Sequence, residues 1–142
     1  MLTGWSALAN PSAGFHIPGV LDLTPELVAS LVRRLFDSSE QDSATAILEQ
    51  YGLRPHERER IRVRVAALKL SQGDLARLRE AIESARRDYR DVLAWAEYPE
   101  ELNQPTWRLP AEEVNRIRAR DLAQYRDWLA ANGWPPTVLP EP

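Results

Sequence analysis

The chain has 142 residues, of which 44% are hydrophobic and 27% charged, and its 18 basic and 21 acidic side chains give a formal net charge of −3. These proportions are typical of one globular domain and exclude a disordered or fibrous chain. A chain of this length buries roughly two thirds of its unfolded surface, so it can hold one hydrophobic core without disulfides or metals.

The absence of cysteine excludes disulfides, thiolate catalysis and cysteine-based zinc sites. Residues 1–20 lack a basic stretch followed by a continuous apolar one, and no run of 18 apolar residues occurs. We therefore expect a cytoplasmic protein without a membrane partner. The negative net charge also argues against nucleic acid as a partner, although all but one of the basic residues are arginine.

Residues 1–23 are predicted to form an irregular arm. Closely spaced glycines and prolines prevent a long helix there, while apolar residues such as Trp5 and Phe15 could cover the domain. A disordered segment would contain fewer aromatic and branched side chains.

The clearest helix signal begins at Thr24, an N-cap residue that is followed by Pro25 at the first helical position. Leu23 and Val28 are spaced as a hydrophobic staple around this start. The helix should run to about residue 37. Its apolar stripe consists of Leu27, Val28, Leu31, Val32, Leu35 and Phe36, and we expect this stripe to pack against the long helix described below.

Two further helices are predicted before residue 72. The first covers about 40–51 and ends at Gly52. In the stretch 55–71 the residues at 60–65 alternate between apolar and arginine, as a strand would. We favour a helix, because a helix distributes the arginines and brings Ile61, Val65 and Leu68 onto one face.

A long fourth helix is predicted from about residue 75 to residue 97, after Asp74 as N-cap. Its apolar residues recur at alternating spacings of three and four, which is a heptad pattern. They are Leu75, Leu78, Ile82, Ala85, Tyr89, Val92 and Ala96. Such a helix is roughly 34 Å long at 1.5 Å per residue. It could be the central helix of the fold, or its seam could also serve a second chain.

Pro99, Pro105 and Pro110 predict a rigid crossover, and a last helix then runs from Pro110 to Gly133. Residues 134–142 should be an extended tail. The fold expected is therefore an all-α, single five-helix domain over 1–142. Its third and fourth helices should pair antiparallel across the turn at 71–74, and its fifth should return across the fourth.

The segment 88–98 is the most distinctive part of the chain, because it combines carboxylates, an arginine and aromatic side chains on one helix. The candidate binding residues are Asp88, Arg90, Asp91, Trp95, Glu97 and Tyr98, with Trp107 beyond them. Together with residues 67–74, the segment 88–99 resembles a pattern, LKLSxGD…DYRDVLxxAEYP, shared by small bacterial helical proteins without an assigned activity. The resemblance implies a bacterial source and a helical fold, and it transfers no catalytic residue.

Two interpretations of this segment stay open. Asp88 and Asp91 lie three residues apart, with Trp95 one turn further, so apolar surroundings could raise a carboxyl pKa and create a general acid. Alternatively, the carboxylates pair with neighbouring arginines and the aromatic side chains fill the core, which we favour. Catalysis would need a pocket and a raised carboxyl pKa, and exposed aspartates would argue against it.

No other chemical signature is found. His16 and His56 lack metal-ligand spacing, and the glycine-rich phosphate loops and nucleophile elbows are absent, so we assign no catalytic residue, metal or cofactor. Arginines crowd residues 54–64, but Glu57 and Glu59 are interleaved with them. We therefore expect a solvated, self-compensated surface there.

Trp5, Trp107 and Trp134 lie outside the predicted helices, where each either covers an edge of the core or binds a partner. We favour the first interpretation, although tryptophan is enriched in binding hot spots. Residues 104–109 are the first candidate for a partner-binding surface. Our leading hypothesis is a non-enzymatic protein–protein interaction module that binds a protein partner or a second copy of itself. The alternatives are an enzyme or small-ligand binder at 88–98, and an acidic protein of the immunity or antitoxin type.

Overall fold

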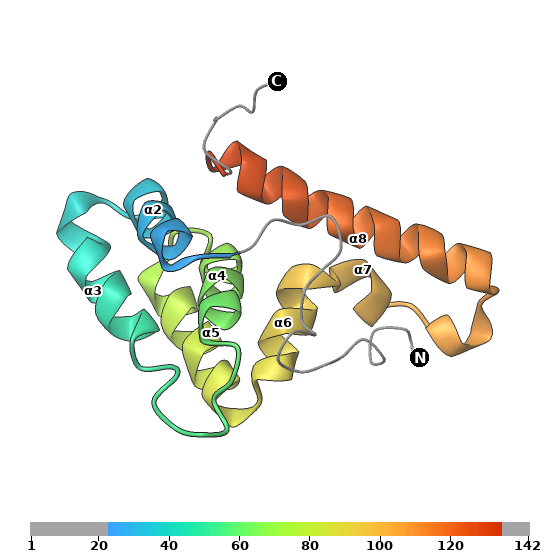
Figure 1. The fold of residues 1–142 in the computed structure, drawn as a ribbon, viewed down its shortest axis with the longest axis horizontal. Coiled ribbons are helices and arrows are strands. Elements are labelled where there is room, and N and C mark those ends of the chain that lie inside the picture. The colour runs from blue at the N-terminus through green and yellow to red at the C-terminus, as the bar shows by residue number, and fades with distance from the viewer. Residues whose placement is uncertain (1–22, 135–142) are drawn as a thin grey trace.

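The computed structural model describes residues 23–134, and this part of the chain is all-α, as predicted, with no strand. The predicted number of five helices is wrong, because this part contains seven α-helices and one 3-10 helix. Except for Leu23 and Trp134, the predicted N-terminal arm and C-terminal tail lie outside the described residues. The helices are α2 (Pro25–Leu35), α3 (Ser38–Leu48), α4 (Arg60–Ser71), α5 (Leu75–Arg87), α6 (Tyr89–Glu97), α7 (Pro99–Leu102), the 3-10 helix η1 (Thr106–Arg108) and α8 (Ala111–Ala131) (Figure 1).

The first helix begins as its sequence predicts. The Thr24 hydroxyl accepts a hydrogen bond from the backbone N–H of Leu27 at 3.1 Å, and Pro25 opens α2. The helical interpretation of residues 60–65 is also confirmed, because they form the first turns of α4. This helix starts at residue 60 rather than 55, and residues 52–59 form a loop.

The prediction of one continuous helix over 75–97 is wrong, because the helix breaks at Asp88. This residue has extended backbone angles (φ −159°, ψ 105°), and its carboxylate accepts a hydrogen bond from the backbone N–H of Arg90 at 3.1 Å. Aspartate favours such N-cap positions because its side chain replaces a missing backbone partner. Figure 1 shows that α6 turns back beside α4 instead of continuing the line of α5.

The central helix is α4, which packs against α2, α5 and α6. The expected pairing of the third and fourth predicted helices is present as the α4–α5 contact across the turn at 72–74. The expected position of α2 is wrong, because its main contacts are with α4 and α3. The last helix, α8, lies mainly against α6 and α7. The segment 63–68 of α4 explains its central place, since five of its six residues are fully buried.

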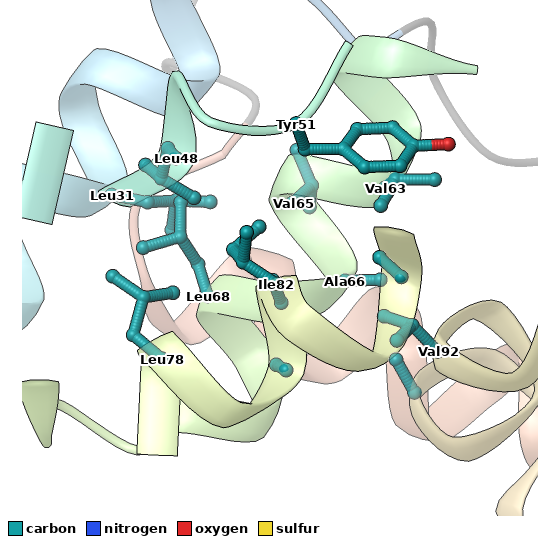
Figure 2. Packing of buried hydrophobic residues seen from close by; sticks show 14 of the residues in the cluster. Leu31, Leu48, Tyr51, Val63, Val65, Ala66, Leu68, Leu78, Ile82 and Val92 are labelled. Carbon is teal, nitrogen blue, oxygen red and sulfur yellow. The ribbon is translucent and has the colours of Figure 1, made fainter. Parts of the chain in front are cut away.

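Most of the heptad residues pack in the protein's own hydrophobic core. Leu78, Ile82, Val92 and Ala96 are fully buried, and Figure 2 shows the first three of these packed with side chains of α4 and of the residues before it. The buried part of the seam is therefore filled by the protein's own helices, whereas Leu75 and Tyr89 are half-buried. None of the helices within residues 23–134 combines the length and the apolar character needed to cross a membrane.

The break at Asp88 can be tested with Asp88→Ala. In a continuous helix alanine would stabilise the protein, because alanine has the higher helix propensity. With Asp88 as N-cap, we expect the free energy of unfolding to fall by about 1 kcal/mol in urea denaturation. Glu83→Ala, at an exposed position within α5, is the control and should change it by less than about 0.5 kcal/mol. A stabilising Asp88→Ala would contradict the break.

The internal position of the seam is tested with Ile82→Ala. We expect a loss of about 3 kcal/mol in the free energy of unfolding, because the substitution leaves a cavity in the core. The unfolding midpoint, followed by circular dichroism, should be independent of protein concentration. A midpoint that rises with concentration would show instead that the seam stabilises a dimer.

Candidate functional site

The strongest polar contact in the candidate segment joins Glu97, at the end of α6, to Arg62 on α4. The guanidinium donates from Nε to Oε2 at 2.8 Å and from Nη2 to Oε1 at 2.5 Å. Both side chains are buried, and the Tyr98 hydroxyl accepts a further hydrogen bond from Arg62 Nη2 at 3.1 Å. We call Arg62, Glu97, Tyr98 and the neighbouring Tyr125 the polar cluster.

Burial and pairing govern the charges in the polar cluster. Burial lowers the pKa of Arg62, but the hydrogen bonds and charge of Glu97 outweigh it, so the pKa is raised and the guanidinium stays charged. Burial and the Glu97 carboxylate raise the pKa of Tyr98. Burial also raises the pKa of Tyr125, whose hydroxyl has no hydrogen-bond partner among residues 23–134. The Arg62–Glu97 ion pair therefore fastens α6 to α4.

The other charged candidates lie at the opposite end of α6. Asp88 and Arg90 form a two-pronged ion pair, with Nε–Oδ1 at 2.9 Å and Nη2–Oδ2 at 2.8 Å. The Arg90 hydrogen bonds lower the pKa of Asp88 despite the opposing effect of burial. Asp91 is exposed. The raised carboxyl pKa that general acid catalysis requires is therefore absent at Asp88, and the geometry favours the ion-pairing interpretation.

Trp95 belongs to neither group. Its side chain is 43% exposed and lines an open groove of about 490 Å³. The other lining residues are Leu70, Arg77, Glu80, Ala81 and Ser84. The six candidates at 88–98 therefore do not form one site. Glu97 and Tyr98 lie in the polar cluster, Asp88, Arg90 and Asp91 lie at the other end of α6, and Trp95 lines the groove.

Trp107 is the most exposed large apolar side chain of the described residues, at 79%, and it lies on η1 in the connector formed by residues 103–110. The expectation that Trp107 covers the core is therefore wrong, whereas Trp134 does pack against the core. The Arg108 guanidinium is 5.9 Å from the centre of its ring. Backbone hydrogen bonds from Arg108 to Pro105 (2.8 Å) and from Leu109 to Thr106 (3.1 Å) hold the turn. Leu102, just before the connector, is 50% exposed.

Asp121 of α8, which the sequence pattern does not single out, holds α7, the helix that precedes the connector. Its carboxylate is buried and accepts hydrogen bonds from the backbone N–H groups of Glu100 and Glu101, each at 2.9 Å. Ion pairs of Arg120 with Glu100 (2.6 Å) and of Arg118 with Glu101 (3.1 Å) flank it. The connector therefore joins two helices, α7 and α8, that are fastened to each other.

The expected self-compensated surface at residues 54–64 is wrong. Glu57 is only 6% exposed, and its Oε1 accepts hydrogen bonds from the backbone N–H groups of Gly52 (2.8 Å) and Leu53 (3.0 Å). Burial tends to raise its pKa, but these bonds and the charge of Arg86 lower it. Glu57 is thus used to anchor the loop and does not lie among the surface arginines.

The role of the ion pair in the polar cluster is tested with Glu97→Gln. We expect the free energy of unfolding to fall by about 3 kcal/mol, because the variant removes the charge that offsets the buried guanidinium. The double variant Arg62→Met, Glu97→Leu should recover most of this loss in the same urea titration. A Glu97→Gln effect below about 0.5 kcal/mol would show that the ion pair does not hold α6.

The described residues contain no group of three or more histidine, aspartate and glutamate side chains placed to hold a metal ion. No protein-family model, curated protein or solved structure matches this chain significantly. The resemblance of residues 67–74 and 88–99 to a bacterial sequence pattern therefore remains an expectation.

Proposed function

We propose that the protein is a non-enzymatic protein–protein interaction module that binds its partner through Trp107 and the connector around it. The observation that carries the proposal is the exposure of Trp107, at 79%, on a short turn held by backbone hydrogen bonds. Burying a tryptophan removes a large apolar area from water, and this residue dominates many binding hot spots.

Preorganisation of the connector supports this proposal. Pro105 and Pro110 restrict the backbone on both sides of η1, and Asp121 fixes the helix that precedes it. A partner therefore does not have to order the loop on binding, and a large part of the usual entropic cost is absent. The Arg108 guanidinium over the ring adds a cationic group to this surface, and the exposed Leu102 precedes the connector.

The partner can be another protein or a second copy of this chain, and the connector is the proposed surface in either case. The heptad seam is a weaker candidate, because five of its seven residues are buried between the protein's own helices and only Leu75 and Tyr89 are half-buried. An enzyme is the weaker candidate, because the pKa of Asp88 is lowered and Asp91 is exposed.

The proposal is tested with Trp107→Ser in quantitative affinity capture from the native cytoplasm, and in sedimentation velocity of the purified protein. We expect the variant to lose a partner that the wild type retains, with affinity reduced by about thirtyfold, as for a hot-spot residue. Sedimentation velocity identifies the partner as a second copy if the purified wild type forms a dimer and the variant does not.

Leu53→Ser is the matched control, because Leu53 is 75% exposed on a different loop. It should leave both binding and the thermal unfolding midpoint unchanged, and Trp107→Ser should leave the midpoint unchanged. Equal binding by wild type, variant and control would rule out the connector as the interaction surface.

A further inference from the structure

The loop at 52–59 is fixed from within the protein. Besides the Glu57 bonds described above, the Tyr51 hydroxyl donates to the backbone carbonyl of Arg58 at 2.6 Å. Arg64 Nη2 donates to the carbonyl of Tyr51 at 2.8 Å. The side chains that this loop exposes therefore have defined positions.

This anchoring leaves positive charge on the surface. Arg54, Arg58 and Arg60 are exposed, while Glu57 is buried and Glu59 half-buried. Within residues 23–134, none of these three arginines has a carboxylate within 4 Å. The negative side chains that the sequence interleaves with them are thus turned away from solvent.

The same loop borders the break between α5 and α6. In Figure 1 the green loop before α4 and the α5–α6 junction lie together at the lower edge of the molecule. Between them is a concave pocket of about 340 Å³, lined by His56, Ala85, Arg87, Asp88, Tyr89 and Arg90. His56 from the loop and Arg87 and Arg90 from the junction therefore line one concavity.

Both guanidinium groups retain donors. Arg90 uses Nε and Nη2 for Asp88, which leaves Nη1 for another acceptor. Arg87 donates to the Ser84 hydroxyl at 3.2 Å and has no carboxylate partner among the described residues. With two guanidinium groups and one carboxylate, the lining carries a net positive charge in a protein whose net charge is −3.

We propose that this pocket binds the phosphate group of a small phosphomonoester. Arginine donors match the oxygens of a phosphate group, and charge-assisted hydrogen bonds of this kind are stronger than neutral ones. The half-buried Tyr89 supplies a wall against which the organic part of the ligand can lie. A pocket of a few hundred Å³ has the size of small-molecule sites.

Two observations favour a small ligand over nucleic acid. The acidic net charge opposes binding to a long phosphate backbone. Arg87 and Arg90 also line one concavity, and three other exposed arginines, Arg54, Arg58 and Arg60, are not among its lining residues. The Trp95 groove does not share this preference, because its single arginine, Arg77, is offset by Glu80. The proposal is independent of the proposed role of Trp107, which lies on another element.

The experiment is a titration of the full chain with inorganic phosphate and with phenyl phosphate, at constant ionic strength, followed by amide chemical shifts. We expect saturable shifts confined to residue 56 and residues 85–90, with phenyl phosphate binding more tightly because its ring contacts Tyr89. Arg87→Gln should weaken phenyl phosphate binding by about tenfold, the effect of losing one charge-assisted hydrogen bond.

Arg79→Gln is the control, because it removes the same charge from an exposed position of the same helix outside the pocket. It should leave the affinity unchanged. Equal weakening by both variants, shifts that do not saturate, or tighter binding of a single-stranded oligonucleotide at the same residues would each overturn the proposal. Trp107→Ser should have no effect on this titration. The proposed partner surface and the proposed phosphate pocket can therefore be disproved independently of each other.

Discussion

The buried guanidinium of Arg62 is the constraint on which the second half of the structure depends. Arg62 sits on the most enclosed helix, and a charge there is tolerated only if a carboxylate and further hydrogen-bond partners meet it. Glu97 can reach it only if α6 turns back toward α4, and the break at Asp88 permits that turn. The positions of α7 and α8 follow, because α7 begins two residues after Glu97 and α8 is attached to α7 through Asp121.

Local signals in the sequence predicted the helices well and their arrangement less well. Thr24 and Pro25 define the start of α2 because a cap depends only on neighbouring residues. The break at Asp88 was missed because the apolar heptad continues through it, as both α5 and α6 bury that face. The Asp88 cap is a short local feature, and the longer apolar pattern conceals it.

The candidate site was predictable only where it depends on residues close in sequence. The pairing of Asp88 with a neighbouring arginine was one of the two expected interpretations. The partner of Glu97 lies 35 residues away, and no local pattern connects the two positions. The inward turn of Glu57 likewise depends on backbone donors of a loop whose shape the sequence does not specify. The surface charge at residues 54–64 was therefore predicted wrongly. The interleaved glutamates and arginines suggested a neutral surface, but Glu57 is buried.

The arrangement of the helices also affects how the chain folds. Most close contacts join residues that are near one another in sequence, as in the pairs α4 and α5, α5 and α6, and α7 and α8. Loops that close such contacts are short, so little entropy is lost before the contacts form. Folds dominated by such local contacts reach the native state quickly, on the microsecond-to-millisecond scale typical of helical bundles. The break at Asp88 adds an exception, because it brings α6 back beside α4 and sets Glu97 against Arg62, 35 residues away.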